Sequence, residues 1–60
     1  MARLSATECL VAGQVAQGYS NKEIAAVFGK TEATIKNQVS STLRKLRLQS
    51  RAQLIVFVLG

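Results

Sequence analysis

One helix-start signal occurs twice in the first half of the chain. The pattern Ser-x-x-Glu occurs at Ser5–Glu8 and again at Ser20–Glu23. In such a capping box the serine oxygen and the glutamate carboxylate each accept a hydrogen bond from a backbone N–H that lacks a partner inside the helix. Gly18 and Gly29 follow at positions where a left-handed residue can end a helix. The sequence therefore predicts helices over about residues 6–17 and 21–28.

The second half of the chain carries the signals of two further helices. Thr31 is a cap candidate, and apolar residues after it recur at spacings of four, four and three, which predicts a helix over about residues 32–46. Ser50 is the cap candidate for a helix over about residues 51–59. The β-branched and aromatic run Ile55–Val58 suits a strand equally well. We predict a helix there, and hence an all-α domain of four helices.

Apolar residues at helical spacing predict a single core. Sixty residues without proline, repeat or low-complexity segment indicate one folded unit spanning residues 1–60. The lone cysteine, Cys9, is expected to be a small buried hydrophobe. The other expected core residues are Val11, Ala12, Val15, Ile24, Ala25, Phe28, Ile35, Val39, Leu43, Leu46, Leu54 and Val58.

The composition argues against catalysis and against a membrane segment. Histidine is absent, and one cysteine with three acidic residues supplies neither a catalytic triad nor a set of metal ligands. We therefore expect no enzyme activity and no cofactor. The longest uninterrupted apolar run, Leu54–Leu59, is too short to cross a bilayer, and no signal peptide is visible. A single cysteine without a disulfide partner points to the reducing cytoplasm.

Basic residues concentrate in the second half of the chain. The net charge is +5, and all three acidic residues lie within the first 32 residues. A positive field at one end of the molecule suits a polyanionic partner such as DNA. Arg47 and Arg51 are expected to be solvated or salt-paired, with contact to a DNA backbone as the alternative. The basic residues that follow the last glutamate are Lys36, Arg44, Lys45, Arg47 and Arg51.

Two helices joined by a tight turn at Gly29, the second longer and followed by basic residues, form the pattern of a helix-turn-helix DNA reader. An ordered series of motifs extends this pattern: Leu4-Ser5, Glu8, Ala16-Gln17-Gly18, Ser20-Asn21-Lys22-Glu23-Ile24-Ala25, Thr34-Ile35-Lys36-Asn37, Lys45-Leu46 and Ser50-Arg51-Ala52-Gln53. With this series, the segment from Leu4 to Gln53 resembles the DNA-binding domain of the LuxR family of bacterial transcription regulators. The resemblance implies a four-helix domain whose third helix enters the major groove and whose fourth helix commonly makes dimer contacts.

The third predicted helix has a polar face that is a candidate for reading bases. With the apolar stripe turned inward, a rotation of 100° per residue places Ala33, Lys36, Asn37, Ser40 and Arg44 together on an outward face. We expect Lys36, Asn37 and Ser40 to contact base edges, which agrees with the positions that the family uses. The alternative is an ordinary solvated helix surface.

Residues that flank this face are candidates for contact with DNA phosphates. The start of the second helix offers free N–H groups, which favour anions. Such contacts position a protein on DNA without reading its sequence. For Ser20 the alternative is a simple helix cap, and a cap can coexist with phosphate binding. The expected backbone contacts are Ser20, Asn21, Lys22, Thr34, Arg44 and Lys45.

The fourth predicted helix is apolar on most of its circumference. Leu54 and Val58 are expected to face the core, which leaves other apolar side chains to a second partner. We predict a weak homodimer on DNA half-sites about 10 base pairs apart. The alternative is a fragment with an exposed apolar end. The expected interface residues are Ile55, Val56, Phe57 and Leu59.

A protein-interaction module is the strongest competing function. Such a module would bind another regulator or RNA polymerase, since a fold alone does not establish a function. An outward Leu10 and the apolar fourth helix favour this alternative, whereas the basic third helix favours double-stranded DNA. RNA is disfavoured, because Tyr19, Phe28 and Phe57 are the only aromatic residues and form no evident stacking platform.

Overall fold

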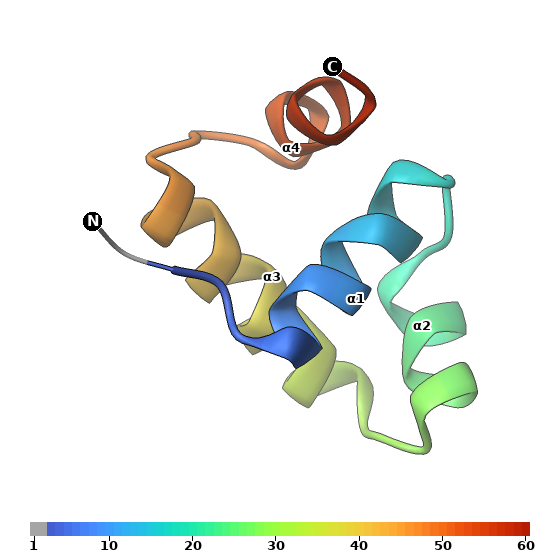
Figure 1. Ribbon diagram of the computed structural model, residues 1–60. Helices are drawn as coiled ribbons and strands as arrows, with labels where there is room; N and C mark the ends of the chain where they lie inside the picture. The colour runs from blue at the N-terminus through green and yellow to red at the C-terminus, as the bar shows by residue number, and fades with distance from the viewer. Residues whose placement is uncertain (1–2) are drawn as a thin grey trace.

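The computed structural model describes residues 3–60, and these fold into four α-helices without a strand (Figure 1). The helices are α1 (Ala6–Ala16), α2 (Asn21–Phe28), α3 (Glu32–Leu46) and α4 (Arg51–Leu59). The predicted all-α fold is confirmed, and α1 ends one residue earlier than expected. The run Ile55–Val58 is helical rather than extended.

Helix α1 is the central element of the fold. It packs against each of the other three helices, while α2 and α3 also pack against each other. Helix α4 packs mainly on α1, and in Figure 1 it lies across the end of the domain, away from α2. The arrangement supports α3 along one side and leaves its opposite side open to solvent.

Local side-chain caps explain why the helices begin where they do. In α1 the Ser5 hydroxyl accepts from the Glu8 N–H at 3.1 Å, and the Glu8 carboxylate accepts from the Ser5 N–H at 2.8 Å. The same reciprocal pair joins Ser20 and Glu23 at 3.2 and 2.9 Å. The predicted capping boxes are therefore both formed. Thr31 and Ser50 cap α3 and α4 as predicted.

A residue with positive φ ends or follows each of the four helices, and Gly60, with a φ of 66°, lies at the end of α4. Gly18 follows α1 with a φ of 94°, and Gly29 ends α2 with a φ of 65°. Arg47 ends α3 with a φ of 58° and is the one non-glycine residue with positive φ in the described part of the chain. The Leu48 N–H donates to the Leu43 carbonyl at 2.9 Å, which closes this turn. The reversal at Arg47 sends the chain back toward α1.

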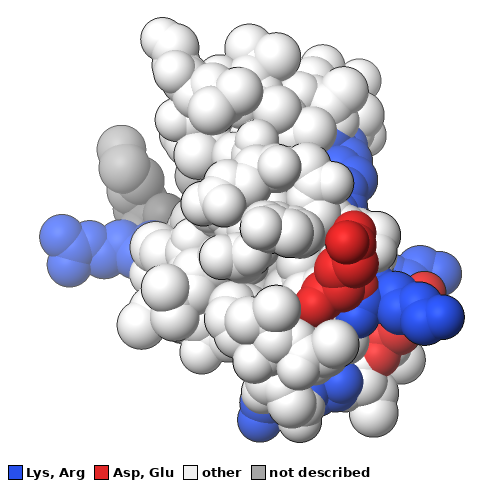
Figure 2. Space-filling model, turned by 90° about the vertical axis from the view of Figure 1, so that its right-hand side faces the viewer, with Lys and Arg blue, Asp and Glu red and all other residues white. Residues whose placement is uncertain are grey.

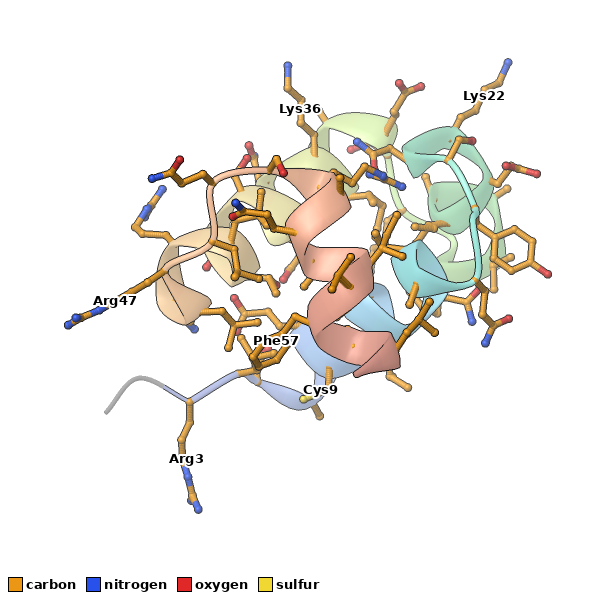
Figure 3. The ribbon with its side chains drawn as sticks, turned by 90° about the horizontal axis from the view of Figure 1, so that it is seen from above. Arg3, Cys9, Lys22, Lys36, Arg47 and Phe57 are labelled. Atoms are coloured by element: carbon orange, nitrogen blue, oxygen red, sulfur yellow. The ribbon has the colours of Figure 1, made fainter. Side chains whose placement is uncertain are left out.

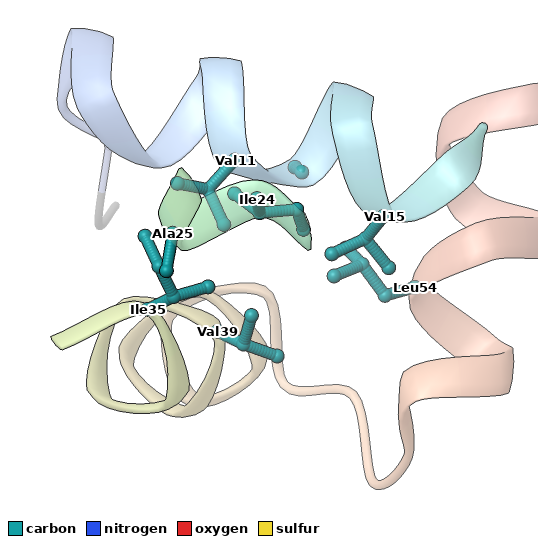
Figure 4. Packing of buried hydrophobic residues seen from close by; sticks show 8 residues of the cluster. Val11, Val15, Ile24, Ala25, Ile35, Val39 and Leu54 are labelled. Carbon is teal, nitrogen blue, oxygen red and sulfur yellow. The ribbon is translucent and has the colours of Figure 1, made fainter. Parts of the chain in front are cut away.

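A small apolar core joins all four helices (Figure 4). Two residues that we expected in it are exposed. Cys9 lies about 100° around the helix from Glu8, outside the buried stripe of α1, so its sulfur reaches the surface. Val58 is 41% exposed, because it lies one turn beyond Leu54, where neighbouring helices cover it only in part. The buried core consists of Val11, Ala12, Val15, Ile24, Ala25, Ile35, Val39 and Leu54, with Phe28, Leu43 and Leu46 partly buried against it.

Glu8 does more than cap its own helix. Its side chain lies almost fully inside the protein, with the residue only 3% exposed. One carboxylate oxygen accepts from Lys45 Nζ at 2.8 Å and the other from Ser41 Oγ at 2.7 Å, so the carboxylate joins the start of α1 to the second half of α3. The Lys45 ammonium, the Ser5 N–H and the Ser41 hydroxyl lower the pKa of Glu8 to about 2, against the opposing effect of burial.

Thr42 is the other polar residue in the interior. It is fully buried on α3. Its hydroxyl donates to the Gln38 carbonyl of the same helix at 2.8 Å. No buried side-chain N or O atom in residues 3–60 lacks a hydrogen-bond partner. The interior polar groups are therefore satisfied without water or ligand.

We expect Glu8→Gln to destabilise the domain at neutral pH, because the partly buried Lys45 side chain then loses its counter-charge. The folded state lowers the pKa of Glu8 from 4.5 to about 2, so its contribution is complete above about pH 4.5. That contribution is lost as the pH falls through about 2. Thermal unfolding followed by circular dichroism should therefore show a difference between wild type and variant that shrinks from pH 4.5 to pH 2.

The matched control is Glu32→Gln, which removes the same charge from an exposed position in the first turn of α3. It should lower the unfolding midpoint less than Glu8→Gln does at pH 7. Equal effects of the two variants, or a pH-independent effect of Glu8→Gln, would contradict the role assigned to the buried carboxylate.

Candidate nucleic-acid interface

The outward face of α3 carries the residues that we expected to read bases. Lys36, Asn37 and Ser40 are all exposed, and so are Ala33 and Arg44 on the same face. Figure 3 shows the Lys36 side chain extending away from the ribbon, on the same side of the molecule as Lys22 of α2. Because the opposite face of α3 is bound to the core, these polar groups are presented on a fixed support.

The connection between α2 and α3 fixes the angle of this support. Gly29 adopts the left-handed conformation, and the Lys30 N–H donates back to the Ala25 carbonyl at 2.9 Å. Thr31 then caps α3 by accepting from the Thr34 N–H at 3.1 Å. Helix α2 packs on α3 and so braces it. This is a helix-turn-helix arrangement in the sense that the sequence pattern predicted.

The N-terminus of α2 brings together Ser20, Asn21 and Lys22. The Ser20 hydroxyl acts as the helix cap by accepting from the Glu23 N–H. The N–H groups of Asn21 and Lys22 belong to the first turn, where no helix carbonyl can accept from them. They therefore remain available to an anion, and the exposed ammonium of Lys22 lies beside them.

Glu23 places a negative charge close to this N-terminus. Hydrogen bonds from the Ser20 N–H, and then from the Ser20 side chain, lower the pKa of Glu23. Its carboxylate therefore stays ionised at neutral pH and serves the capping box. Any phosphate at this end of α2 would approach the N–H groups and Lys22 rather than the Glu23 side.

The other residues that we expected to contact phosphates differ in their exposure and in the partners that they already have within the protein. Arg44 is exposed, four residues beyond Ser40 on the same face. Thr34 is half-buried, with its hydroxyl 2.8 Å from that of Thr31, so it takes part in the cap of α3. The Lys45 ammonium pairs with Glu8, and its side chain is 35% exposed. The structure thus directs Lys45 toward α1, away from the group formed by Lys36 and Arg44.

Arg51 makes contacts that the sequence did not reveal. Its guanidinium donates to the Asn21 side-chain oxygen at 2.5 Å and to the Tyr19 carbonyl at 2.6 Å. The partners are 30 and 32 residues away in the chain. No spacing rule joins residues so far apart, and the only signal was the position of Arg51 within the series of family-like motifs.

The exposed side of α4 is largely apolar. Val56, Phe57 and Leu59 are exposed, whereas Ile55 is partly buried against the core. Figure 2 shows charged side chains gathered in the lower part of one face and almost none in its upper part, where α4 lies. A shallow apolar depression on this helix is lined by Leu48, Ala52, Gln53, Val56 and Phe57.

Within residues 3–60, no three His, Cys, Asp or Glu side chains come together as a metal site. Among the described helices, none has the length and apolar character needed to cross a membrane.

Comparison with known proteins bears on the identity of this domain. A family model described as bacterial regulatory proteins of the luxR family matches residues 2–58. The response regulator protein VraR of Staphylococcus aureus (strain Mu3) is 44% identical over 43 residues, which cover 72% of this chain and 21% of VraR. VraR of Staphylococcus saprophyticus and of Staphylococcus epidermidis gives the same values. The chain thus spans about a fifth of the length of these relatives. No solved structure gives a significant match. The chain belongs to the LuxR family of bacterial regulatory proteins, as its sequence motifs predicted.

Proposed function

We propose that this domain regulates transcription by sequence-specific binding to double-stranded DNA, with α3 in the major groove, and that it does so without catalysis. The family assignment and the response-regulator relatives support DNA-binding transcription regulation. The observation that carries the proposal is the exposed row of Lys36, Asn37 and Ser40 on a helix whose other face is held by the core. Such a role belongs in the cytoplasm.

The three base-reading residues have distinct chemical roles in this proposal. The Lys36 ammonium donates to guanine O6 or N7, and the Asn37 amide pairs with adenine N6 and N7. The Ser40 hydroxyl can donate or accept. The first half of a recognition helix approaches the base edges most closely, which suits positions 36, 37 and 40 of α3.

Phosphate contacts would hold the domain on both sides of the groove. On one side lie Ser20, Asn21 and Lys22, with the free N–H groups of α2. Thr34 and Arg44 serve the other side. Lys45 contributes less, because Glu8 already neutralises much of its charge.

The direct test is selection of bound sequences from a pool of random duplexes, followed by affinity measurements on the selected duplex across a salt series. Wild type should enrich a repeated motif. We expect Lys36→Gln to weaken binding to that motif roughly tenfold, because loss of one good base contact removes about 1 to 3 kcal/mol of discrimination. Arg3→Gln is the matched control, since Figure 3 shows Arg3 on the side of the molecule opposite Lys36.

Three outcomes would count against this function in different ways. Equal losses for Lys36→Gln and Arg3→Gln would mean that Lys36 acts only through net charge. Salt-sensitive binding without an enriched motif would indicate a nonspecific DNA binder. No binding even at low salt would favour the protein-interaction alternative, whose partner would be another regulator or RNA polymerase. The 62% exposed side chain of Leu10 on α1 would then be its first candidate contact.

We also propose that two copies associate weakly through α4. Val56, Phe57 and Leu59 offer an exposed apolar surface, and Ile55 lies at its border with the core. Burying such side chains removes apolar area from water, which favours association. The surface is small, so we expect DNA to hold the two copies together on neighbouring half-sites about 10 base pairs apart.

Val56→Glu should abolish this association, because it places a charge within the apolar surface. Sedimentation equilibrium at high micromolar concentration is the measurement. Val27→Glu makes the same substitution at an equally exposed valine on α2 and should leave association unchanged. If wild type and both variants sediment as monomers, the dimer proposal is wrong.

A further inference from the structure

Arg51 bridges two helices that otherwise do not pack together. It is the first residue of α4, a half-buried residue whose guanidinium reaches the start of α2. One nitrogen donates to Asn21 Oδ1 at 2.5 Å and another to the Tyr19 carbonyl at 2.6 Å. Among the described residues, α2 and α4 make no helix-to-helix packing contact. The side chain of Arg51 is therefore a direct link between these two elements.

The local position of Arg51 is electrostatically unfavourable. A cation in the first turn of a helix opposes the helix dipole, and α4 has no acidic residue in that turn. Both acceptors of the guanidinium are neutral, and in residues 3–60 the only ion pair joins Lys45 and Glu8. Neither the helix dipole nor charge pairing explains an arginine here. The two directed hydrogen bonds do, because a guanidinium presents several donors in one rigid plane.

We infer that Arg51 is a positioning residue for DNA binding, which fixes the N-terminus of α2 against a phosphate. The inference rests on the proposed function. By engaging Asn21 Oδ1, Arg51 orients the side-chain amide so that its NH₂ group is left to donate elsewhere. By holding the Tyr19 carbonyl, it also fixes the turn that leads into α2. The free N–H groups of Asn21 and Lys22 are then held in a fixed orientation.

The test compares Arg51→Lys and Arg51→Gln with the matched pair Arg3→Lys and Arg3→Gln. Affinity is measured on the duplex selected by wild type, across a salt series, after circular dichroism has verified folding. Lysine keeps the charge but lacks the planar fork, so both Arg51 variants should lose roughly three- to tenfold in affinity. The dependence of affinity on salt should stay as in wild type, because Arg51 itself neutralises no phosphate. The Arg3 variants should lose less than twofold.

A second measurement needs no DNA. In ¹⁵N-labelled free protein, Arg51→Lys should shift the amide signals of Asn21 and Lys22, whereas Arg3→Lys should not. Arg51→Lys, which keeps the charge at this position, should weaken DNA binding in the same direction as Arg51→Gln. This variant keeps the inference testable if Arg51→Gln fails to fold.

Each contrary result has its own meaning. Full affinity in Arg51→Lys would show that only the charge matters and would overturn the inference. A fall of about 0.9 in the salt slope for Arg51→Gln would show direct phosphate contact instead. Unshifted Asn21 and Lys22 signals would show that no positioning occurs. If wild type itself binds no duplex, the proposed function fails, and the inference fails with it.

Discussion

The buried carboxylate of Glu8 is the constraint on which the position of α3 depends. It closes the cap of α1 and binds Ser41 and Lys45 of α3, so one group sets both the start of the central helix and the placement of α3. The apolar contacts of Ile24 and Ile35 hold the other half of α3. With both halves held, only the outward face is free to meet a partner. Breaking the Glu8 contacts would loosen that face without touching any residue on it.

The small size of the domain explains the distribution of its apolar surface. A chain of 60 residues buries a limited fraction of its surface, and within residues 3–60 eight buried side chains form the apolar core. That core can cover one side of α4, at Leu54, but not the side that carries Val56 and Phe57. The uncovered side of α4 is thus a consequence of the small size of the core. It gives the domain an apolar surface separate from α3. The proposed DNA binding and the proposed association of copies therefore use different helices.

Local sequence rules predicted the helices, but they could not predict the contacts between residues far apart in the chain. Caps at Ser5, Ser20, Thr31 and Ser50 depend on residues three positions away, so the helix starts could be read from the sequence. The exposed face of α3 followed from the same helical periodicity. The pairing of Lys45 with Glu8 spans 37 residues and that of Arg51 with Asn21 spans 30, and no pattern in one sequence encodes such distances. The burial of Cys9 was wrongly predicted because residue type was given more weight than the position of Cys9 beside the apolar stripe of α1.

In the proposed complex, the outward face of α3 meets the base edges of DNA. Titration of the ¹⁵N-labelled domain with its selected duplex, followed by amide chemical shifts, tests this contact most directly. We expect the largest shifts around Lys36, Asn37 and Ser40, a second group at the start of α2, and small shifts along α1. Largest shifts on α4 or around Leu10, with α3 unperturbed, would contradict the proposed contact.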